Sequence, residues 1–402
     1  MKKHIGIIGG GAAGMMAAVT AARKGTKVTI LERNDRIGKK ILQTGNGKCN
    51  LGNRNLTVEC YHGGDAAWIK QALERFGTED TVCFFQKIGL LIKEKNGYLY
   101  PVSEQAASVL DVLRYELQTL GVEIIYGCKV QKVERTLSGK LVVNDGDREW
   151  QFDAVILTCG GKAAPGTGSD GSGWKIAKKA GHTCIAPVPA LVQLRCLETD
   201  LLKGIAGVRA DSRVRILCDG RETDVERGIS GIPIFQLSRD VNYLLRDRKT
   251  VMAEIDFLPD MTEESYENMK KTRRMLQEKR TAEEFFTGIL NKKLMSVFLK
   301  IAGIKPTTPA VEIPEDKINT FYELCRCFRL HITESNPYEN AQVAAGGIAV
   351  TEVTEDMESK LCPGLYFAGE ILDVDGRCGG YNLQWAWSSG FIAGCSAAIK
   401  TE

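Results

Sequence analysis

The sequence of 402 residues has little of what several classes of protein require. Histidine occurs only four times, and the thirteen cysteines, an odd number, include no C-x-x-C pair. These features exclude a zinc site of paired cysteines, a flavin-linked redox dithiol and a disulfide framework. We therefore expect no metal, and free thiols in the reducing environment of the cytoplasm.

No charge of one sign dominates, because 53 basic residues oppose 50 acidic ones and leave a net charge of +3. A strong basic field for nucleic acid is not expected, although a local patch stays open. No stretch reaches the roughly 18 apolar residues that a membrane-spanning helix needs. Glycines interrupt the apolar run near the N-terminus, so it does not predict a signal peptide. We expect a cytoplasmic protein that binds neither nucleic acid nor membrane, of unknown oligomeric state.

What the sequence does contain starts at its N-terminal end. The apolar runs Lys3–Ile8 and Lys27–Leu31 predict strands, and Ala12–Lys24 predicts a helix between them. The connecting turn Gly9–Gly14 has the pattern G-x-G-x-x-G, and Glu32 lies 18 residues after it, where the second strand ends. This βαβ unit predicts dinucleotide binding.

Each residue type in this unit has a chemical reason. Gly9 permits a tight turn, Gly11 lets the backbone approach a pyrophosphate, and Gly14 allows close packing of helix on strand. The helix N-terminus offers amide donors to phosphates, and a carboxylate at Glu32 accepts hydrogen bonds from ribose hydroxyls. The cofactor-binding residues predicted in this unit are Gly9, Gly11, Ala12, Ala13, Gly14, Glu32 and Arg33.

Three further stretches carry a family resemblance: TGNGKCN (44–50), TCGGKAAPGTGSDGSGWKIAKKAGH (158–182) and GLYFAGEILDVDGRCGGYNLQWAWSSGFIAG (364–394). With them, essentially the whole chain resembles the BaiN-like or YhiN-like bacterial flavoproteins, also labelled the aminoacetone oxidase family. The resemblance implies non-covalently bound FAD and the FAD-binding fold of glutathione reductase and fumarate reductase. The sequence departs from the family pattern at 221–225, before the ERGISGIPIFQLS stretch (226–238), and at the alanines 344 and 345. These departures leave the substrate open.

The predicted fold class is α/β, a glutathione-reductase-type, Rossmann-like FAD-binding domain with an inserted domain. The FAD-binding domain is expected to comprise residues 1–188 and 334–402. Short alternating runs predict a β-rich subdomain over 189–258, and a charged, helix-like stretch predicts a helical subdomain over 259–333.

The resemblance also implies further cofactor contacts. The loop 44–50 wraps the pyrophosphate or the ring edge, the backbone at Val130 faces the adenine, and the strand end at 158–161 passes beneath the cofactor. A final helix, predicted to begin at Leu383, points its positive end at the N1–C2 carbonyl edge of the flavin and stabilises the reduced ring. The residues implied are Lys39, Lys40, Thr44, Gly45, Asn46, Gly47, Cys49, Asn50, Val130, Thr158, Cys159, Gly160, Gly161, Gly369, Glu370, Asp373, Gly379, Gly380, Asn382 and Leu383.

The function this implies is an FAD-dependent oxidoreductase that carries hydride from NADH or NADPH to an electron-poor C=C, such as an oxo-steroid or bile-acid-like enone. The sequence has no second G-x-G-x-x-G, so the nicotinamide nucleotide is expected to visit only transiently. Candidate donors to the small-molecule substrate are Arg377, Tyr381 and His331. An amine oxidase of the aminoacetone type and a non-catalytic flavin sensor are the alternatives.

Overall fold

The chain divides into two compact units in a computed structural model that describes residues 2–229 and 231–399. One unit comprises Met1–Ala190 together with Pro337–Glu402, and the other comprises Leu191–Asn336. No helix in the described ranges is long and apolar enough to cross a membrane. The same ranges contain no cluster of histidine, cysteine and acidic residues that could hold a metal ion.

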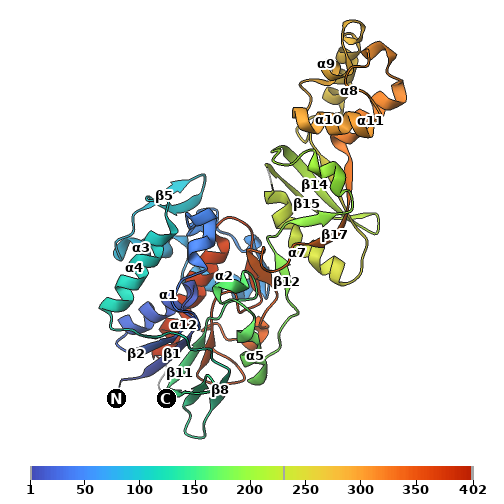
Figure 1. The fold of residues 1–402 in the computed structure, drawn as a ribbon. Helices are drawn as coiled ribbons and strands as arrows, with labels where there is room; N and C mark the ends of the chain where they lie inside the picture. Colours follow the sequence, from blue (N-terminus) through green and yellow to red (C-terminus); the bar gives the residue numbers. More distant parts are fainter. Residues whose placement is uncertain (1, 230, 400–402) are drawn as a thin grey trace. The chain divides into compact units, whose positions relative to one another are not determined.

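The first unit is built on a five-stranded parallel sheet with the order β19-β11-β1-β2-β7 (Figure 1). All four residues of β11 are buried, as expected for a strand covered on both faces. The register places Ile5 opposite Ala154 and Val28. The strands are β1 (His4–Ile8), β2 (Lys27–Leu31), β7 (Glu123–Ile125), β11 (Ala154–Leu157) and β19 (Leu365–Phe367).

Helices from the two ends of the chain, α1 (Ala12–Arg23) and α12 (Tyr381–Ile399), pack directly against each other beside this sheet (Figure 1). Their contact is close because α12 carries glycine where it meets the backbone of α1. A Cβ atom at Gly390 would lie 2.5 Å from the carbonyl oxygen of Ala13, and one at Gly394 would lie 2.5 Å from that of Ala17. The helix starts at Tyr381, two residues before the predicted Leu383.

These two contacts also fix the relative direction of the helices. Each contact advances by four residues on both helices, from 390 to 394 and from 13 to 17, so α1 and α12 run parallel. Tyr381 begins α12 nine residues before Gly390, whereas α1 begins one residue before Ala13. At 1.5 Å per residue, α12 therefore starts about 12 Å before α1 along the shared direction.

Smaller sheets and helices surround this centre. The sheets have the orders β10-β9-β8, β12-β18, β20-β4 and β3-β6-β5. Their strands are β3 (Gly52–Asn53), β4 (Tyr61–Gly63), β5 (Ile92–Lys95), β6 (Tyr98–Pro101), β8 (Lys132–Arg135), β9 (Leu141–Asn144), β10 (Glu149–Phe152), β12 (Val188–Ala190), β18 (Val343–Ala345) and β20 (Val374–Gly376). The helices are α2 (Ala66–Arg75), α3 (Thr78–Lys87), α4 (Ala106–Thr119) and α5 (Ser172–Lys179), and the short 3-10 segment η1 spans Ile41–Gly47.

The second unit combines an antiparallel sheet, in the order β13-β17-β16-β14-β15, with helices. A separate hydrophobic core, which includes Phe286, Phe298 and Phe321, fills it. Its strands are β13 (Leu194–Cys196), β14 (Asp211–Cys218), β15 (Arg221–Ile229), β16 (Val251–Asp256) and β17 (Phe328–Ser335). Its helices are α6 (Thr199–Lys203), α7 (Ile232–Arg246), α8 (Glu263–Arg274), α9 (Ala282–Phe286), α10 (Lys292–Ile301) and α11 (Glu315–Arg326).

Strand β17 lies where the sequence predicts helix. The expected helical subdomain runs to residue 333, but the helices end at Arg326 and the chain then rejoins the sheet beside β16 and β13. Phe328, Leu330 and Ile332 alternate with exposed residues, which is the period of a strand with one buried face. The β-rich stretch in turn contains a full helix, α7.

The close contact of α1 and α12 predicts that Gly394→Val destabilises the protein. A side chain there must push the backbone of Ala17 away, and overpacking of this kind costs roughly 1–3 kcal/mol. Gly166→Ala is the matched control, because a Cβ atom at Gly166 would meet no atom of the described protein within 4 Å. Urea unfolding of both variants checks this, and equal midpoints would contradict the packing argument.

Candidate functional site

The glycine-rich turn between β1 and α1 contains two glycines, Gly9 and Gly14, that close packing within the protein requires. Gly9 has φ +105°, and a Cβ atom there would lie 2.7 Å from the carbonyl oxygen of Thr158 at the end of β11. A Cβ atom at Gly14 would lie 2.0 Å from the carbonyl oxygen of Gly9. Strand and helix therefore come together only because both side chains are absent.

Gly11 differs from both. Its φ of −81° is open to any residue, and a Cβ atom there would meet nothing in the described protein within 4 Å. Neither backbone strain nor packing accounts for a glycine, yet this residue caps the N-terminus of α1, whose amides continue through Ala12 and Ala13. The open space in front of this helix end fits a pyrophosphate that needs close approach to the backbone.

Glu32 lies at the end of β2, is 6% exposed and faces this turn. Its Oε2 accepts a hydrogen bond of 2.8 Å from the Gly10 amide, and its Oε1 accepts from the backbone and side-chain nitrogens of Asn34, both at 2.8 Å. Its orientation is thus fixed beside the glycine turn. Each carboxylate oxygen can accept more than one hydrogen bond, so ribose hydroxyls could still bind.

Arg33 joins the loop 166–173 to this edge of the sheet. It forms an ion pair of 2.5 Å with Asp170, and the adjacent Asn34 donates to the carbonyl oxygen of Thr167 at 3.0 Å. Burial alone would raise the pKa of Asp170, but hydrogen bonds from Ser172 and Arg33 outweigh it and lower the pKa to about 2. The carboxylate therefore stays charged and holds the loop 166–173 in place.

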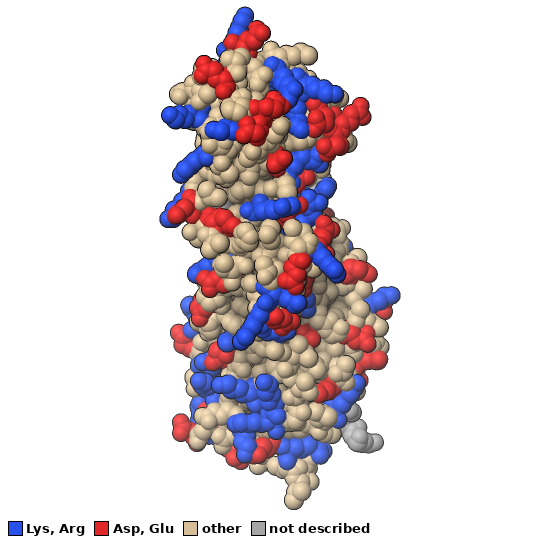
Figure 2. All heavy atoms as spheres, turned by 90° about the vertical axis from the view of Figure 1, so that its right-hand side faces the viewer, with Lys and Arg blue, Asp and Glu red and all other residues tan. Residues whose placement is uncertain are grey.

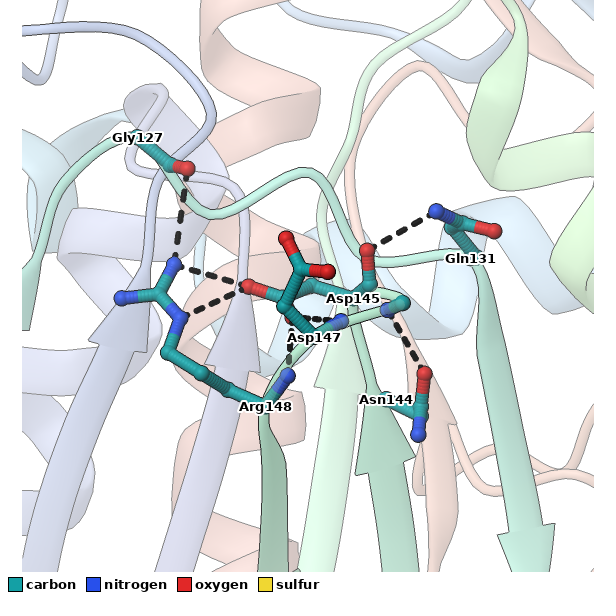
Figure 3. A network of polar contacts seen from close by, with 7 residues as sticks. Gly127, Gln131, Asn144, Asp145, Asp147 and Arg148 are labelled. Atoms are coloured by element: carbon teal, nitrogen blue, oxygen red, sulfur yellow. Dashed lines mark hydrogen bonds and ion pairs between the residues drawn. The ribbon is translucent and has the colours of Figure 1, made fainter.

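The segment that would face the adenine runs beside Glu32. The Cys128 amide donates to the Glu32 carbonyl at 2.9 Å, and Val130 is buried two residues later. The turn between β9 and β10 holds this segment through a polar network (Figure 3). In it, Arg148 pairs with Asp145 at 2.7 Å and reaches the Gly127 carbonyl, while the Gln131 side chain donates to the Asp145 carbonyl.

The two lysines after β2 are both paired. Lys39 binds Asp35 at 2.7 Å, and Lys40 binds Glu370, which follows β19, at 2.6 Å. Glu370 also accepts from the Ala344 amide at 3.0 Å, and its Oε1 lies 2.8 Å from where a Cβ atom of Gly161 would be. The segments that contain Lys40, Gly161 and Glu370 were predicted as separate contacts of the cofactor. They therefore meet at the carboxyl ends of β11 and β19, where ligands bind in such sheets.

The loop 44–50 comprises the irregular second half of η1, which ends at Gly47, and the three residues that follow it. Gly45 and Asn46 have left-handed backbone conformations, and the Thr44 hydroxyl donates to the Ile41 carbonyl. Cys49 is fully buried, and burial raises the pKa of its thiol to about 12, so it stays neutral. Gly47 has φ +82°, and the side-chain oxygen of Asn50 is buried without a hydrogen-bond partner among the described residues.

The ends of β1 and β11 are joined tightly. The Thr158 hydroxyl lies 2.7 Å from the Gly9 carbonyl, and the Cys159 thiol, whose pKa burial raises to about 12, lies 3.4 Å from the Ile8 carbonyl. Gly160 has φ +70°, and Gly369 receives a hydrogen bond at its carbonyl from Trp385.

The turn before α12 is held by its own side chains. Gly379 and Gly380 have φ +135° and +95°, and the Asn382 side chain bonds both the amide and the carbonyl of Gly376, at 2.8 and 2.7 Å. The Asp373 amide donates to the Ile348 carbonyl. The first-turn amides of α12, among them that of Leu383, have no acceptor inside the helix and form its positive end.

The three predicted proton donors lie in different settings. Tyr381 is buried, burial raises the pKa of its hydroxyl, and that hydroxyl donates to the Asn55 carbonyl at 3.3 Å. Arg377 lies in the turn before α12, where its amide donates to the Cys60 carbonyl. His331 lies on β17 of the second unit, and its Nδ1 is 2.6 Å from Glu198.

Two tyrosines of β6 were missed from the sequence. Tyr98 would lie 3.0 Å from a Cβ atom at Gly379, in the turn before α12, and Tyr100 would lie 3.9 Å from one at Gly45, in the loop 44–50. The alternation around buried Leu99 could have placed both on one face, but not beside those segments.

Together with its family match and its relatives, the fold shows that the chain is an FAD-dependent oxidoreductase with a Rossmann-type domain, which confirms the predicted fold class and cofactor. The chain belongs to the HI0933-like protein Rossmann domain family, which it matches over residues 3–396. The family resemblance drawn from its motifs is thus confirmed.

Relatives of known name cover the chain from end to end. The 3-dehydro-bile acid delta(4,6)-reductase of Clostridium scindens is 44% identical, over 99% of both chains. A ribosomal RNA dihydrouridine synthase of Haemophilus influenzae is 31% identical, over 98% of both. Among solved structures, 3-ketosteroid delta1-dehydrogenase from Sterolibacterium denitrificans shares the fold, with a TM-score of 0.51, 12% identity, and coverage of 99% of this chain and 100% of the other.

The glycine turn predicts that Gly11→Val folds but binds no FAD, because the added side chain meets no protein atom yet fills the space in front of α1. Gly14→Val is the contrasting variant, since its side chain would collide with the Gly9 carbonyl and should disrupt the fold. Circular dichroism and flavin absorbance of the purified variants test this. Full flavin occupancy in Gly11→Val would show that the cofactor binds elsewhere.

Proposed function

We propose that the protein reduces a C=C bond conjugated to a carbonyl, using NADH or NADPH as the source of hydride and FAD as the carrier. The observation that carries the proposal is the 44% identity, over 99% of both chains, to a bile-acid delta(4,6)-reductase. The candidate site agrees with it, since it provides for a dinucleotide and for a helix N-terminus that stabilises negative charge. We propose a cytoplasmic location, in keeping with thirteen free thiols.

The two named relatives support one type of reaction on different substrates. Dihydrouridine is uridine whose ring C=C, conjugated to a carbonyl, has been reduced, and a delta(4,6)-reductase acts on a conjugated alkene as well. A small steroid-like enone is our proposal for this chain, because identity to the bile-acid enzyme is 44% against 31% for the RNA enzyme. Basic and acidic side chains are interspersed over most of the face in Figure 2, apart from a group of basic side chains toward its lower end.

In this reaction the chain's own residues stabilise charge on the flavin ring, donate a hydrogen bond to the substrate carbonyl and supply a proton. FAD, when bound, supplies hydride transfer at its N5 atom. The first turn of α12 offers amide donors to charge at the far edge of the ring. Arg377, permanently charged, is our proposed donor to the substrate carbonyl, where negative charge grows as hydride reaches the β-carbon. Tyr381 and His331 remain secondary candidates.

Tyr100 is our proposed source of the proton for the α-carbon. Burial raises the pKa of its hydroxyl, so the group is protonated at neutral pH. In this step the enolate carbon takes the phenol proton, the C–H bond forms as the O–H bond breaks, and the phenolate regains a proton from solvent. The proposal rests on the place of Tyr100 beside Gly45 of the loop 44–50, on the same strand whose Tyr98 lies beside Gly379 in the turn before α12.

An anaerobic stopped-flow experiment tests the function. NADH or NADPH should bleach the flavin, and a 3-oxo-steroid with conjugated double bonds should reoxidise it at least about tenfold faster than air-saturated buffer. Bleaching by aminoacetone with peroxide formed on admitting air, and no response to either nicotinamide, would instead identify an amine oxidase. Reoxidation by ribosomal RNA but not by the steroid would overturn the substrate class.

Tyr100→Phe should slow reoxidation by the enone about 100-fold, within the usual range for loss of a general acid, and leave flavin reduction by the nicotinamide unchanged. The solvent isotope effect on reoxidation should also change, which a merely structural role would not produce. Tyr115→Phe, at a tyrosine that is 65% exposed on α4, is the control. Equal slowing of both half-reactions would remove Tyr100 from the proton path.

A further inference from the structure

We propose that the side-chain oxygen of Asn50 accepts a hydrogen bond from the N3–H group of the bound flavin, and so makes Asn50 the residue that recognises the pyrimidine edge of the ring. This inference rests on the FAD site but not on the substrate or the direction of the reaction. It gives a specific task to Asn50, which the sequence implies only as one of the cofactor contacts of the loop 44–50.

The first observation is a buried acceptor that the protein leaves unused. Asn50 is 9% exposed, and its Oδ1 has no partner among the described residues. A buried amide oxygen without a donor costs free energy, so such groups are rare in folded proteins and call for a partner. The backbone on either side is fixed, because the Leu51 amide donates to the Leu99 carbonyl at 2.8 Å and the Trp387 indole donates to the Leu51 carbonyl at 3.0 Å.

The second observation is the position of this oxygen beside the N-terminus of α12. A Cβ atom at Gly380 would lie 2.8 Å from Asn50 Oδ1, and Gly380 directly precedes Tyr381, the first of 19 helical residues. The first-turn amides of the helix are donors without intrahelical acceptors. One unused acceptor and a set of unused donors therefore lie next to each other.

The pyrimidine edge of oxidised flavin has the complementary arrangement. It presents acceptors at N1 and at the C2 carbonyl, and next to them the only N–H donor of the ring system, at N3. Helix amides match the acceptors, whereas Asn50 Oδ1 matches the donor. Without a side chain at position 380, nothing of that residue shields the oxygen.

A second unpartnered oxygen close by does not compete for this role. Gln384 Oε1 is fully buried, and the Nε2 atom of the same side chain donates to the Thr81 hydroxyl at 2.9 Å. It lies 3.0 Å from where a Cβ atom of Gly52 would be. Its position inside the packed first turns of α12 makes it part of the helix packing.

The chain offers a matched control in Asn53, which is 4% exposed. Its Oδ1 accepts from the Asn55 amide at 2.9 Å, and its Nδ2 donates to the Gly379 carbonyl at 3.1 Å. Asn53 is thus a buried asparagine of the same neighbourhood whose polar atoms the protein itself satisfies. Its removal should destabilise the apoprotein, whereas removal of the unpartnered Asn50 oxygen should not.

The test compares binding of FAD and N3-methyl-FAD to apoprotein by flavin fluorescence. Wild type should bind FAD at least about tenfold more tightly, because the methylated ring cannot donate to Asn50. Asn50→Ala should bind the two about equally, since it loses the acceptor and leaves room for the methyl group. Asn53→Ala should keep the wild-type ratio while its apoprotein melts at a lower temperature than that of Asn50→Ala.

Two results would overturn the proposal: equal binding of both flavins by wild type, or an unchanged ratio in Asn50→Ala. The latter would point to a ribityl hydroxyl or a water molecule as the partner of Asn50. Either result would leave the reductase proposal standing as long as FAD binds. A protein that binds neither flavin would refute the flavin site itself.

Discussion

The close contact between α1 and α12 is the constraint on which the rest of the site depends. Gly390 and Gly394 admit the backbone of α1 at Ala13 and Ala17, so helices from opposite ends of the chain lie parallel against one sheet. The eight-residue stagger places the start of α12 about 12 Å before that of α1. In the proposed site, one helix end would face the pyrophosphate and the other the flavin ring, with the ribityl chain between them. Loosening this contact would change the spacing of both.

The unusual residues of the site fall into two physical groups. Gly9 and Gly14 are explained by protein atoms that a side chain would strike. Gly11 and Asn50 are not: one leaves space that no described atom fills, and the other buries an oxygen that no described donor reaches. A folded chain gains nothing from either feature by itself. Both become favourable when a dinucleotide that carries a flavin occupies the site.

Local pattern predicted much of this fold. The pattern of apolar residues predicted β1, α1 and β2, and the glycine turn with Glu32 predicted the dinucleotide site. Local pattern could not predict contacts between distant residues, because no spacing rule links residues about 330 positions apart. The ion pair of Lys40 with Glu370 and the proximity of Asn50 to Gly380 are examples. Strand β17 was missed for another reason: its alternating residues follow directly on the charged helix α11, without a glycine or proline to mark the change.

The pairing of Lys40 also decides what stabilises charge in this site. A lone lysine at the carboxyl edge of the sheet would attract the negative charge of a reduced ring, but Glu370 at 2.6 Å cancels most of its field. Lys39 is likewise paired with Asp35. In the proposed site, positive potential would then come from Arg377 and from the peptide dipoles at the N-terminus of α12, which the bonds of Asn382 to Gly376 hold in position. Because these dipoles are fixed before the charge appears, they stabilise it with little reorganisation.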